Sequence, residues 1–397
     1  MKRADWHLRA NFFVLIYLLA ALTSGVSSRL SAEQHLSWLT VHLFLLGAIS
    51  NGILTWSEHF VAALLWARSQ GRLRHLHIVV ALNLGVLGVL AGKGMNIGWL
   101  LIVSALLVGS IVILYLWGIY ESISQTLNRR YVGLIRYYQW AGVSLLVGVL
   151  LGTIDSFKSD GDPWQPKLAL AHLHVNLMGW VGLTIVGTLI TFWPTVLRTP
   201  MHAKAVKYGV AALPILLSGL LVVLVGSLLD LRTLSATGAV VYLSGFLLAL
   251  TPAALVISQR IPDRTSSWMM ATGAVGISLL LIADALISAR SDSAEKLLKA
   301  IENHSLVIFT VSLMPIFLGS LTYLLPVVLG RGPKVNRELE SLINTGWRLR
   351  VFLLPISSML LLFTPWQALG YVFAGSALGI FLILAFATMI RAKKYAS

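Results

Sequence analysis

The chain contains twelve apolar segments, each about as long as a helix needs to be to cross a lipid bilayer. Backbone N–H and C=O groups inside lipid must bond to each other, which leaves helices as the form that a series of such segments can take. The segments are 11–28, 38–66, 75–91, 96–118, 137–154, 168–196, 205–229, 234–258, 267–288, 302–330, 348–364 and 366–391. The sequence therefore predicts an all-α polytopic membrane protein with twelve transmembrane helices and the lipid bilayer as its surroundings.

The composition agrees with one integral membrane domain over 1–397. Hydrophobic residues make up 57% of the chain and charged residues only 11%, which excludes a soluble domain of this size. The longest connections, such as 289–301 and 331–347, are predicted to be loops too short for an extramembrane domain. The chain has no cysteine, so disulfides, cysteine-ligated zinc and iron–sulfur clusters are excluded.

The basic residues predict an orientation. The net charge is +15, and most Lys and Arg residues lie in alternate loops, beginning with the segment before the first span. Cytoplasmic loops are enriched in Lys and Arg, so we expect both termini to be cytoplasmic. Because this charge flanks apolar helices, we interpret it as a membrane-surface feature and predict no nucleic-acid partner.

An internal repeat connects the second, sixth and tenth spans. The stretch GTLITFWPTVLR at 187–198 matches GSLTYLLPVVLG at 319–330, an offset of 132 residues. Two pairs of histidines match at the same offset, His172 with His304 and His42 with His174. The sequence therefore predicts three four-helix units with pseudo-threefold symmetry, approximately 1–135, 136–265 and 266–397.

Histidines near the predicted outer ends of these spans are candidate ligands. An ionisable residue within a span is costly and indicates a functional site, and neutral imidazole is a common ligand of haem iron and copper. The candidate cofactor and metal ligands are His35, His42, His172, His174, His304 and Met178. The alternative is that these histidines only bond to neighbouring helices or to interfacial water.

The spacing in AHLHVNLMGW, residues 171–180, has a geometric consequence. Each helical residue turns by about 100°, so His172 and His174 diverge by about 200° and cannot easily ligate one metal. We therefore predict that this helix forms a shared wall between two pockets. Met178 lies four residues after His174 and shares its face. Asp284, near the outer end of the ninth span, either lies at the interface or anchors a histidine.

Other ionisable residues have weaker interpretations. Glu58 and His59 are neighbours near the cytoplasmic end of the second span, where they either pass protons inward or extend to the interface. His75, His77 and His202 lie among Lys and Arg, and we interpret them as solvated contacts to lipid headgroups.

Two stretches resemble the catalytic subunits (subunit I) of haem–copper oxidases. AHLHVNLMG resembles the alanine–histidine–aromatic–histidine motif of their tenth span, and HSLVIFTVSLMPIFLGSLTYLLPVVLG resembles their second span. The resemblance implies twelve spans, a bacterial inner membrane location and haem b. It implies His174 and His304 as ligands of one low-spin haem, with His172 and His42 serving a second haem or copper. It also implies a redox partner such as a cytochrome or cupredoxin.

The chain departs from that family at the copper site. The seventh span, 205–229, contains no histidine, so the usual three-histidine copper centre is missing. The chain resembles a divergent member, similar to the NnrS group or to oxidase-like copper-handling proteins. Electron transfer or chemistry on O2 or NO is the first function this implies, and any enzyme activity would be that of an oxidoreductase. Copper transport or oxidase assembly without haem is the alternative, and a non-metal transporter is the third.

Overall fold

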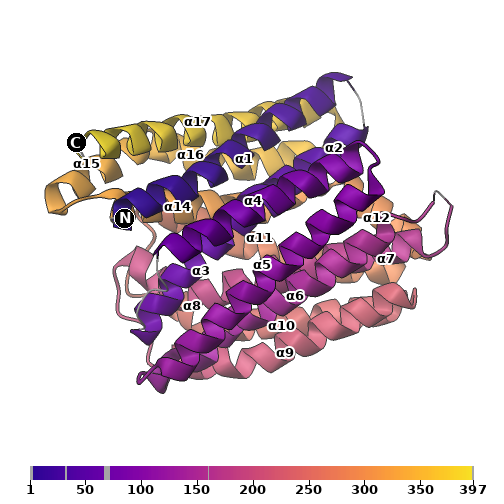
Figure 1. Ribbon diagram of the computed structural model, residues 1–397, viewed down its shortest axis with the longest axis horizontal. Helices are drawn as coiled ribbons and strands as arrows, with labels where there is room; N and C mark the ends of the chain where they lie inside the picture. The colour runs from indigo at the N-terminus through magenta and orange to yellow at the C-terminus, as the bar shows by residue number, and fades with distance from the viewer. Residues whose placement is uncertain (1–2, 32–33, 67–71, 160, 396–397) are drawn as a thin grey trace. The chain divides into compact units, whose positions relative to one another are not determined.

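The computed structural model describes residues 3–31, 34–66, 72–159 and 161–395. Within these ranges the chain is helical and forms no β-strand (Figure 1). The described residues include 11 helices long and apolar enough to cross a membrane, or up to 12 spans if a bent pair counts as one. The prediction of an all-α multi-pass membrane protein is confirmed at this level.

Most spans are single continuous helices. They are α1 (Arg3–Ser31), α4 (Arg72–Gly94), α5 (Gly98–Gln125), α6 (Val132–Asp155), α9 (Ala205–Leu228), α10 (Arg232–Ile257), α11 (Thr265–Arg290) and α17 (Gln367–Lys394). Short 3-10 turns, η2 (Arg129–Tyr131) and η5 (Thr364–Trp366), precede α6 and α17.

The three histidine-bearing spans are built differently, because each contains a π-helical segment. The second span is α2 (Gln34–His42), η1 (Leu43–Ile49) and α3 (Ser50–Leu65). The sixth is α7 (Gln165–His174), η3 (Val175–Leu183) and α8 (Thr184–Leu197). The tenth is α13 (Ser305–Ile308), η4 (Phe309–Leu313) and α14 (Met314–Leu329). No other part of the described chain is π-helical, and π segments occur frequently at functional sites.

Two predicted loops contain helices. The segment 289–301 overlaps α12 (Ala294–Asn303), whose apolar residue Leu297 packs against Leu170. The segment 331–347 contains α15 (Pro333–Ile343), which bends by 45° into α16 (Trp347–Leu362). The prediction that these two segments are loops was wrong. Each contains a short amphipathic helix, which has too few consecutive apolar residues to be recognised as a span. At about 24 Å, α16 alone is short for a bilayer core of about 30 Å.

The chain divides into two compact units. The first contains Met1–Thr55, Pro262–Ile277 and His304–Ser397, and the second contains Trp56–Ile261 and Ser278–Asn303. His42 and His304 therefore belong to the first unit, and His172 and His174 to the second. In the first unit α1 packs against η1 and α17. The predicted division into three repeats has different boundaries, and the threefold arrangement stays a prediction.

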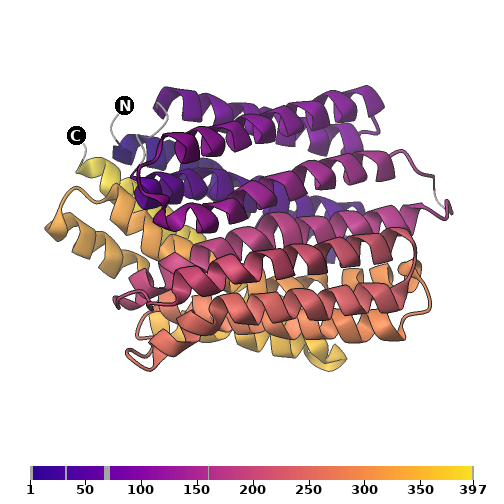
Figure 2. The ribbon, with the colours of Figure 1, turned by 90° about the horizontal axis from the view of Figure 1, so that it is seen from below.

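In the second unit, α9 and α10 approach each other closely along their length (Figures 1 and 2). Gly219 on α9 meets Gly238 on α10, and Gly226 and Gly245 each face backbone atoms of the other helix. A Cβ added at Gly238 would lie 2.5 Å from the backbone nitrogen of Val223. Small residues allow this approach in membranes, where helix association depends on van der Waals packing.

We predict that Gly238→Ala destabilises the protein by about 1–3 kcal/mol, because backbone cannot move aside as a flexible side chain can. The matched control is Gly379→Ala on α17, where an added Cβ meets no heavy atom within 4 Å. The free energy of unfolding in detergent measures both variants. Equal stability of the two would contradict the close packing of α9 on α10.

Candidate functional site

The ring of His172 packs against α6 where two glycines, Gly148 and Gly152, have no side chains. Its Nδ1 donates to the carbonyl oxygen of Gly148 at 2.8 Å. A Cβ added at Gly152 would lie 2.6 Å from both Cε1 and Nδ1 of the His172 ring. One turn later, Asn176 donates its amide to the carbonyl of His172 at 2.7 Å and occupies the space over Gly148. The pair of glycines, four residues apart, is what allows a half-buried imidazole and an amide to face α6.

This contact fixes which ring nitrogen of His172 carries the proton. A carbonyl oxygen only accepts, so Nδ1 must be the donor, and Nε2 of the neutral ring then carries the lone pair. Histidines that bind metals almost always donate their other ring N–H in this way to a carbonyl, a carboxylate or water. His172 thus has the tautomer and the fixed ring orientation of a metal ligand.

His174 faces a different part of the second unit and is 3% exposed. Its Nδ1 lies 3.2 Å from the hydroxyl of Ser227 on α9, and its Nε2 lies 3.3 Å from Oδ1 of Asp284 on α11. The two histidines therefore diverge, as their spacing predicts, and Asp284 is the anchor of a histidine. A carboxylate accepts, so Nε2 of His174 donates in this arrangement and offers no lone pair to a metal.

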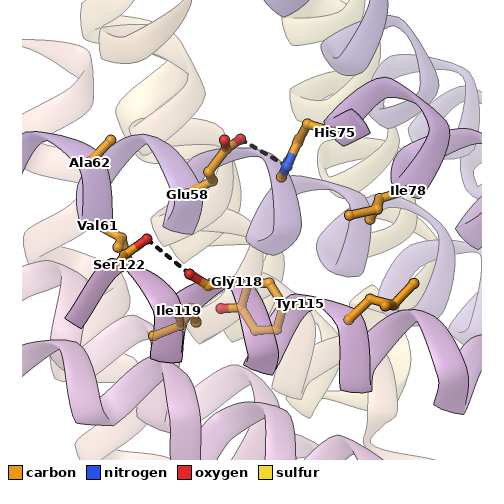
Figure 3. Close-up of a pocket in the computed structure, with 10 residues that line it drawn as sticks. Glu58, Val61, Ala62, His75, Ile78, Tyr115, Gly118, Ile119 and Ser122 are labelled. Atoms are coloured by element: carbon orange, nitrogen blue, oxygen red, sulfur yellow. Dashed lines mark hydrogen bonds and ion pairs between the residues drawn. The ribbon is translucent and has the colours of Figure 1, made fainter. Parts of the chain in front are cut away.

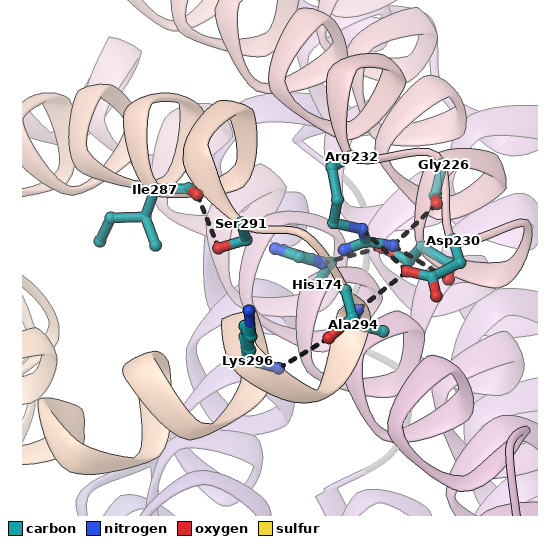
Figure 4. Close-up of polar contacts among 10 residues, drawn as sticks. His174, Gly226, Asp230, Arg232, Ile287, Ser291, Ala294 and Lys296 are labelled. Atoms are coloured by element: carbon teal, nitrogen blue, oxygen red, sulfur yellow. Dashed lines mark hydrogen bonds and ion pairs between the residues drawn. The ribbon is translucent and has the colours of Figure 1, made fainter.

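An ion pair between Asp230 and Arg232 follows the end of α9 (Figure 4). Asp230 accepts a hydrogen bond from the backbone nitrogen of Ala294 at 2.8 Å, in the first turn of α12. Arg232, 6% exposed, pairs with Asp230 at 3.1 Å and donates to the carbonyl of Gly226 at 3.0 Å. Asp230 has a positive φ of 58°, so the chain turns sharply there between α9 and α10. Asp230 thereby connects that turn to α12.

The other predicted ligands have separate surroundings. His42 donates Nδ1 to the carbonyl of Trp38, one turn earlier, at 2.9 Å and stacks on that indole. His304 is exposed at the start of α13. Met178 is buried, and its carbonyl accepts from the hydroxyl of Tyr242 at 2.6 Å. The side chain of His35 lies outside the described residues.

The predicted ligands do not form a ready metal centre within either unit. Among the described residues, no group of three or more His, Asp or Glu side chains could hold a metal ion. The structure brings His174 together with Asp284, and it turns His172 away toward α6.

Glu58 pairs with a residue that the sequence interpretation assigned elsewhere. Its Oε2 lies 2.9 Å from Nδ1 of His75 on α4, and His75 is 5% exposed (Figure 3). His59 contacts the rings of Trp56 and Phe60. The two alternatives for Glu58 and His59, proton passage or extension to the interface, stay predictions. The prediction of a solvated His75 was wrong. The available signal was Glu58 itself, because a carboxylate within a span needs a partner.

No protein-family model matches the chain, and no curated protein sequence matches it. The likeness to haem–copper oxidases therefore depends on the motif residues quoted above.

We predict that Gly152→Ala destabilises the protein by about 1–3 kcal/mol by forcing the His172 ring off α6. Replacing His172 by Ala in the same chain removes that clash, so the double variant should lose less stability than the two single losses added together. The free energies of unfolding of the four proteins in detergent give this coupling. Additive losses would contradict the contact between the ring and Gly152.

We predict that Asp230→Ala costs about 1–3 kcal/mol, because it removes the acceptor for Ala294 and leaves an alanine at positive φ. Asp230→Asn is the control, since asparagine keeps an acceptor oxygen and tolerates a left-handed backbone. Thermal unfolding in detergent should place the asparagine variant between the native protein and the alanine variant. An alanine variant as stable as the native protein would show that Asp230 does not hold α12.

Proposed function

We propose that the chain is a membrane protein that binds haem b, or a metal ion, through histidines of its π-containing spans. The observation that carries the proposal is the contact between His172 and α6. The Gly148 carbonyl holds the ring and leaves the lone pair on Nε2, which is how proteins prepare a histidine to ligate a metal.

His42 supports the same proposal from the first unit. It donates Nδ1 to a backbone carbonyl, as His172 does, so its Nε2 also carries the lone pair. Both histidines lie in the last turn of α-helix before a π segment, η1 after His42 and η3 after His174. Two histidines with the same tautomer in corresponding spans favour a shared role.

The donor set fits haem unevenly. His172 and His42 could each offer an Nε2 lone pair to haem iron, whereas His174 as placed could not, because its Nε2 donates to Asp284. A ligand role for His174 requires Asp284 to move away from Nε2. His304, which the resemblance pairs with His174, is exposed. The resemblance implies ligand roles for both His174 and His172, whereas the hydrogen bonds favour His172 alone.

Bound haem b would supply one-electron transfer and, where a single histidine holds it, chemistry on a diatomic gas. The residues of the chain have supporting tasks. Gly148 and Gly152 make room for the ligand ring, and the Gly148 carbonyl makes its Nε2 more basic. Asp284 and Ser227 hold His174 on the opposite side of the same helix. The helix would thereby separate a cofactor face from a buried charged face.

The pseudo-threefold arrangement belongs to the same proposal. A Cβ at Gly187 would lie 2.6 Å from Cβ of Tyr137, and a Cβ at Gly319 would lie 2.9 Å from Cβ of Met269. Both the glycines and their partners are 132 residues apart. The same contact thus occurs between the fifth and sixth spans and again between the ninth and tenth spans, which supports a common origin of these two repeats.

We predict that the purified full-length protein contains haem b and that His172→Ala removes most of it. Loss of a direct ligand should cost at least the roughly 10–100-fold in affinity that changes to supporting residues cost. His202→Ala is the matched control, because His202 lies in the connection between α8 and α9, where its Nδ1 accepts from the backbone of Lys204. Visible spectra of the oxidised and reduced protein, with haem and copper analysis, measure the outcome.

The resemblance makes a competing prediction, that His174→Ala removes a low-spin haem signal. Loss in the His174 variant with retention in the His172 variant would reverse our assignment. Copper in fixed ratio without haem would favour the copper-handling alternative, in which the same histidines serve copper alone. A native protein free of both would refute cofactor binding altogether.

A further inference from the structure

A small cavity lies between α3, α4 and α5, away from every residue discussed as a cofactor ligand (Figure 3). Its volume is about 30 Å³, and it is only partly enclosed. A water molecule needs about 10–15 Å³ measured in this way, so the cavity has room for about two. Most of the wall is apolar, and the polar atoms come mainly from Glu58, His75, Tyr115 and Ser122.

The Glu58–His75 pair forms one wall of this cavity. The pair joins two membrane-length helices, and Glu58 lies seven residues before the end of α3, about 10 Å along the helix. The sequence that follows, 66–72, includes Arg68 and Arg72, so the pair belongs to an end of the spans with basic connections. An ion pair at this depth is costly to place in a membrane, and nothing in the proposed function uses it.

Of the residues that line the cavity, Glu58 and His75 are the pair that can exchange a proton. Among the described lining residues the titratable groups are Glu58 from α3, His75 from α4 and Tyr115 from α5. The Tyr115 hydroxyl donates to Ser57 at 3.0 Å, and the Ser122 hydroxyl donates to the carbonyl of Gly118 at 2.9 Å. Each hydroxyl oxygen still has acceptor capacity for a water molecule.

A carboxylate and an imidazole that share one proton can keep their hydrogen bond in two protonation states. With one proton between them, the pair exists as Glu58⁻ with imidazolium or as a carboxylic acid with neutral imidazole, and both forms keep the hydrogen bond. An additional proton delivered by hydronium in the cavity gives a carboxylic acid beside imidazolium and leaves water behind. The reverse step returns that proton to water, so only O–H and N–H bonds form and break and no electrons move.

We propose that Glu58 and His75 form a proton-exchange site, connected by water to the end of the spans with basic connections. Its ligand is a proton carried by water. The site does not depend on haem or copper binding, and it is testable in protein without cofactor.

Water access is tested with single cysteines, because the native chain contains none. Ala62 lines the cavity, and its neighbour Ala63 is exposed on the outer side of the same helix. In vesicles, methanethiosulfonate ethylammonium should modify Ala62→Cys at least about tenfold faster than Ala63→Cys, since thiolate forms only where water reaches it. An Ala62→Cys variant that reacts no faster than its neighbour would overturn the water connection.

Proton exchange is tested by infrared difference spectra of the full-length protein during a pH titration. Glu58→Gln keeps the shape and a hydrogen bond to His75, and it should remove one titrating carboxyl signal. Glu121→Gln on α5 is the control and should leave that signal unchanged. His75→Gln should displace the midpoint of that signal, because the imidazole in direct contact with the carboxyl is removed.

Two results would overturn the site. One is a Glu58→Gln spectrum identical to the native one, which would mean that Glu58 keeps a single protonation state. The other is an unchanged midpoint in His75→Gln. Loss of haem in a cofactor-loaded protein would bear on the proposed function and leave both of these readings intact.

Discussion

The absence of water from the hydrocarbon core is the constraint on which this structure depends. Each span closes its own backbone hydrogen bonds, so the described chain consists of helices joined by turns and irregular connections. The same constraint requires that an ionised side chain within a span find its partner on another helix. The described residues follow this rule at Glu58 with His75 and at His174 with Asp284. The first pair links α3 to α4, and the second links α7 to α11.

Glycine determines where polar side chains fit. In lipid, helices gain little from hiding apolar surface, so a close approach is stabilised by contact between atoms. On α9 and α10, glycines bring backbone against backbone. On α6, Gly148 and Gly152 instead receive the imidazole of His172 and the amide of Asn176. One residue type thus produces a purely structural interface in one place and a prepared histidine in another.

The local features of this chain were predictable, and the tertiary ones were not. Hydropathy located the spans because each segment carries its own signal, and two-residue spacing gave the divergence of His172 and His174. The partner of Glu58 depends on how the second and third spans face each other, which no local pattern contains. Because arginines flank His75 in the sequence, the sequence predicted headgroup contacts there, although the side chain is buried. The bend before α16, at Gly346 with a φ of 66°, leaves no trace in hydropathy.

The π segments were also invisible to periodicity, because one extra residue barely changes an apolar run. A π turn joins backbone groups five residues apart where an α turn joins groups four residues apart, so it acts as a one-residue insertion in the helix. Each histidine-bearing span therefore consists of two α-helical segments, one before and one after the π segment, whose rotations about the helix axis are set separately. The segment before the π turn can orient its histidines while the segment after it keeps its own apolar face in place. A chain that varied the chemistry at one end of these spans would not need to repack the other end.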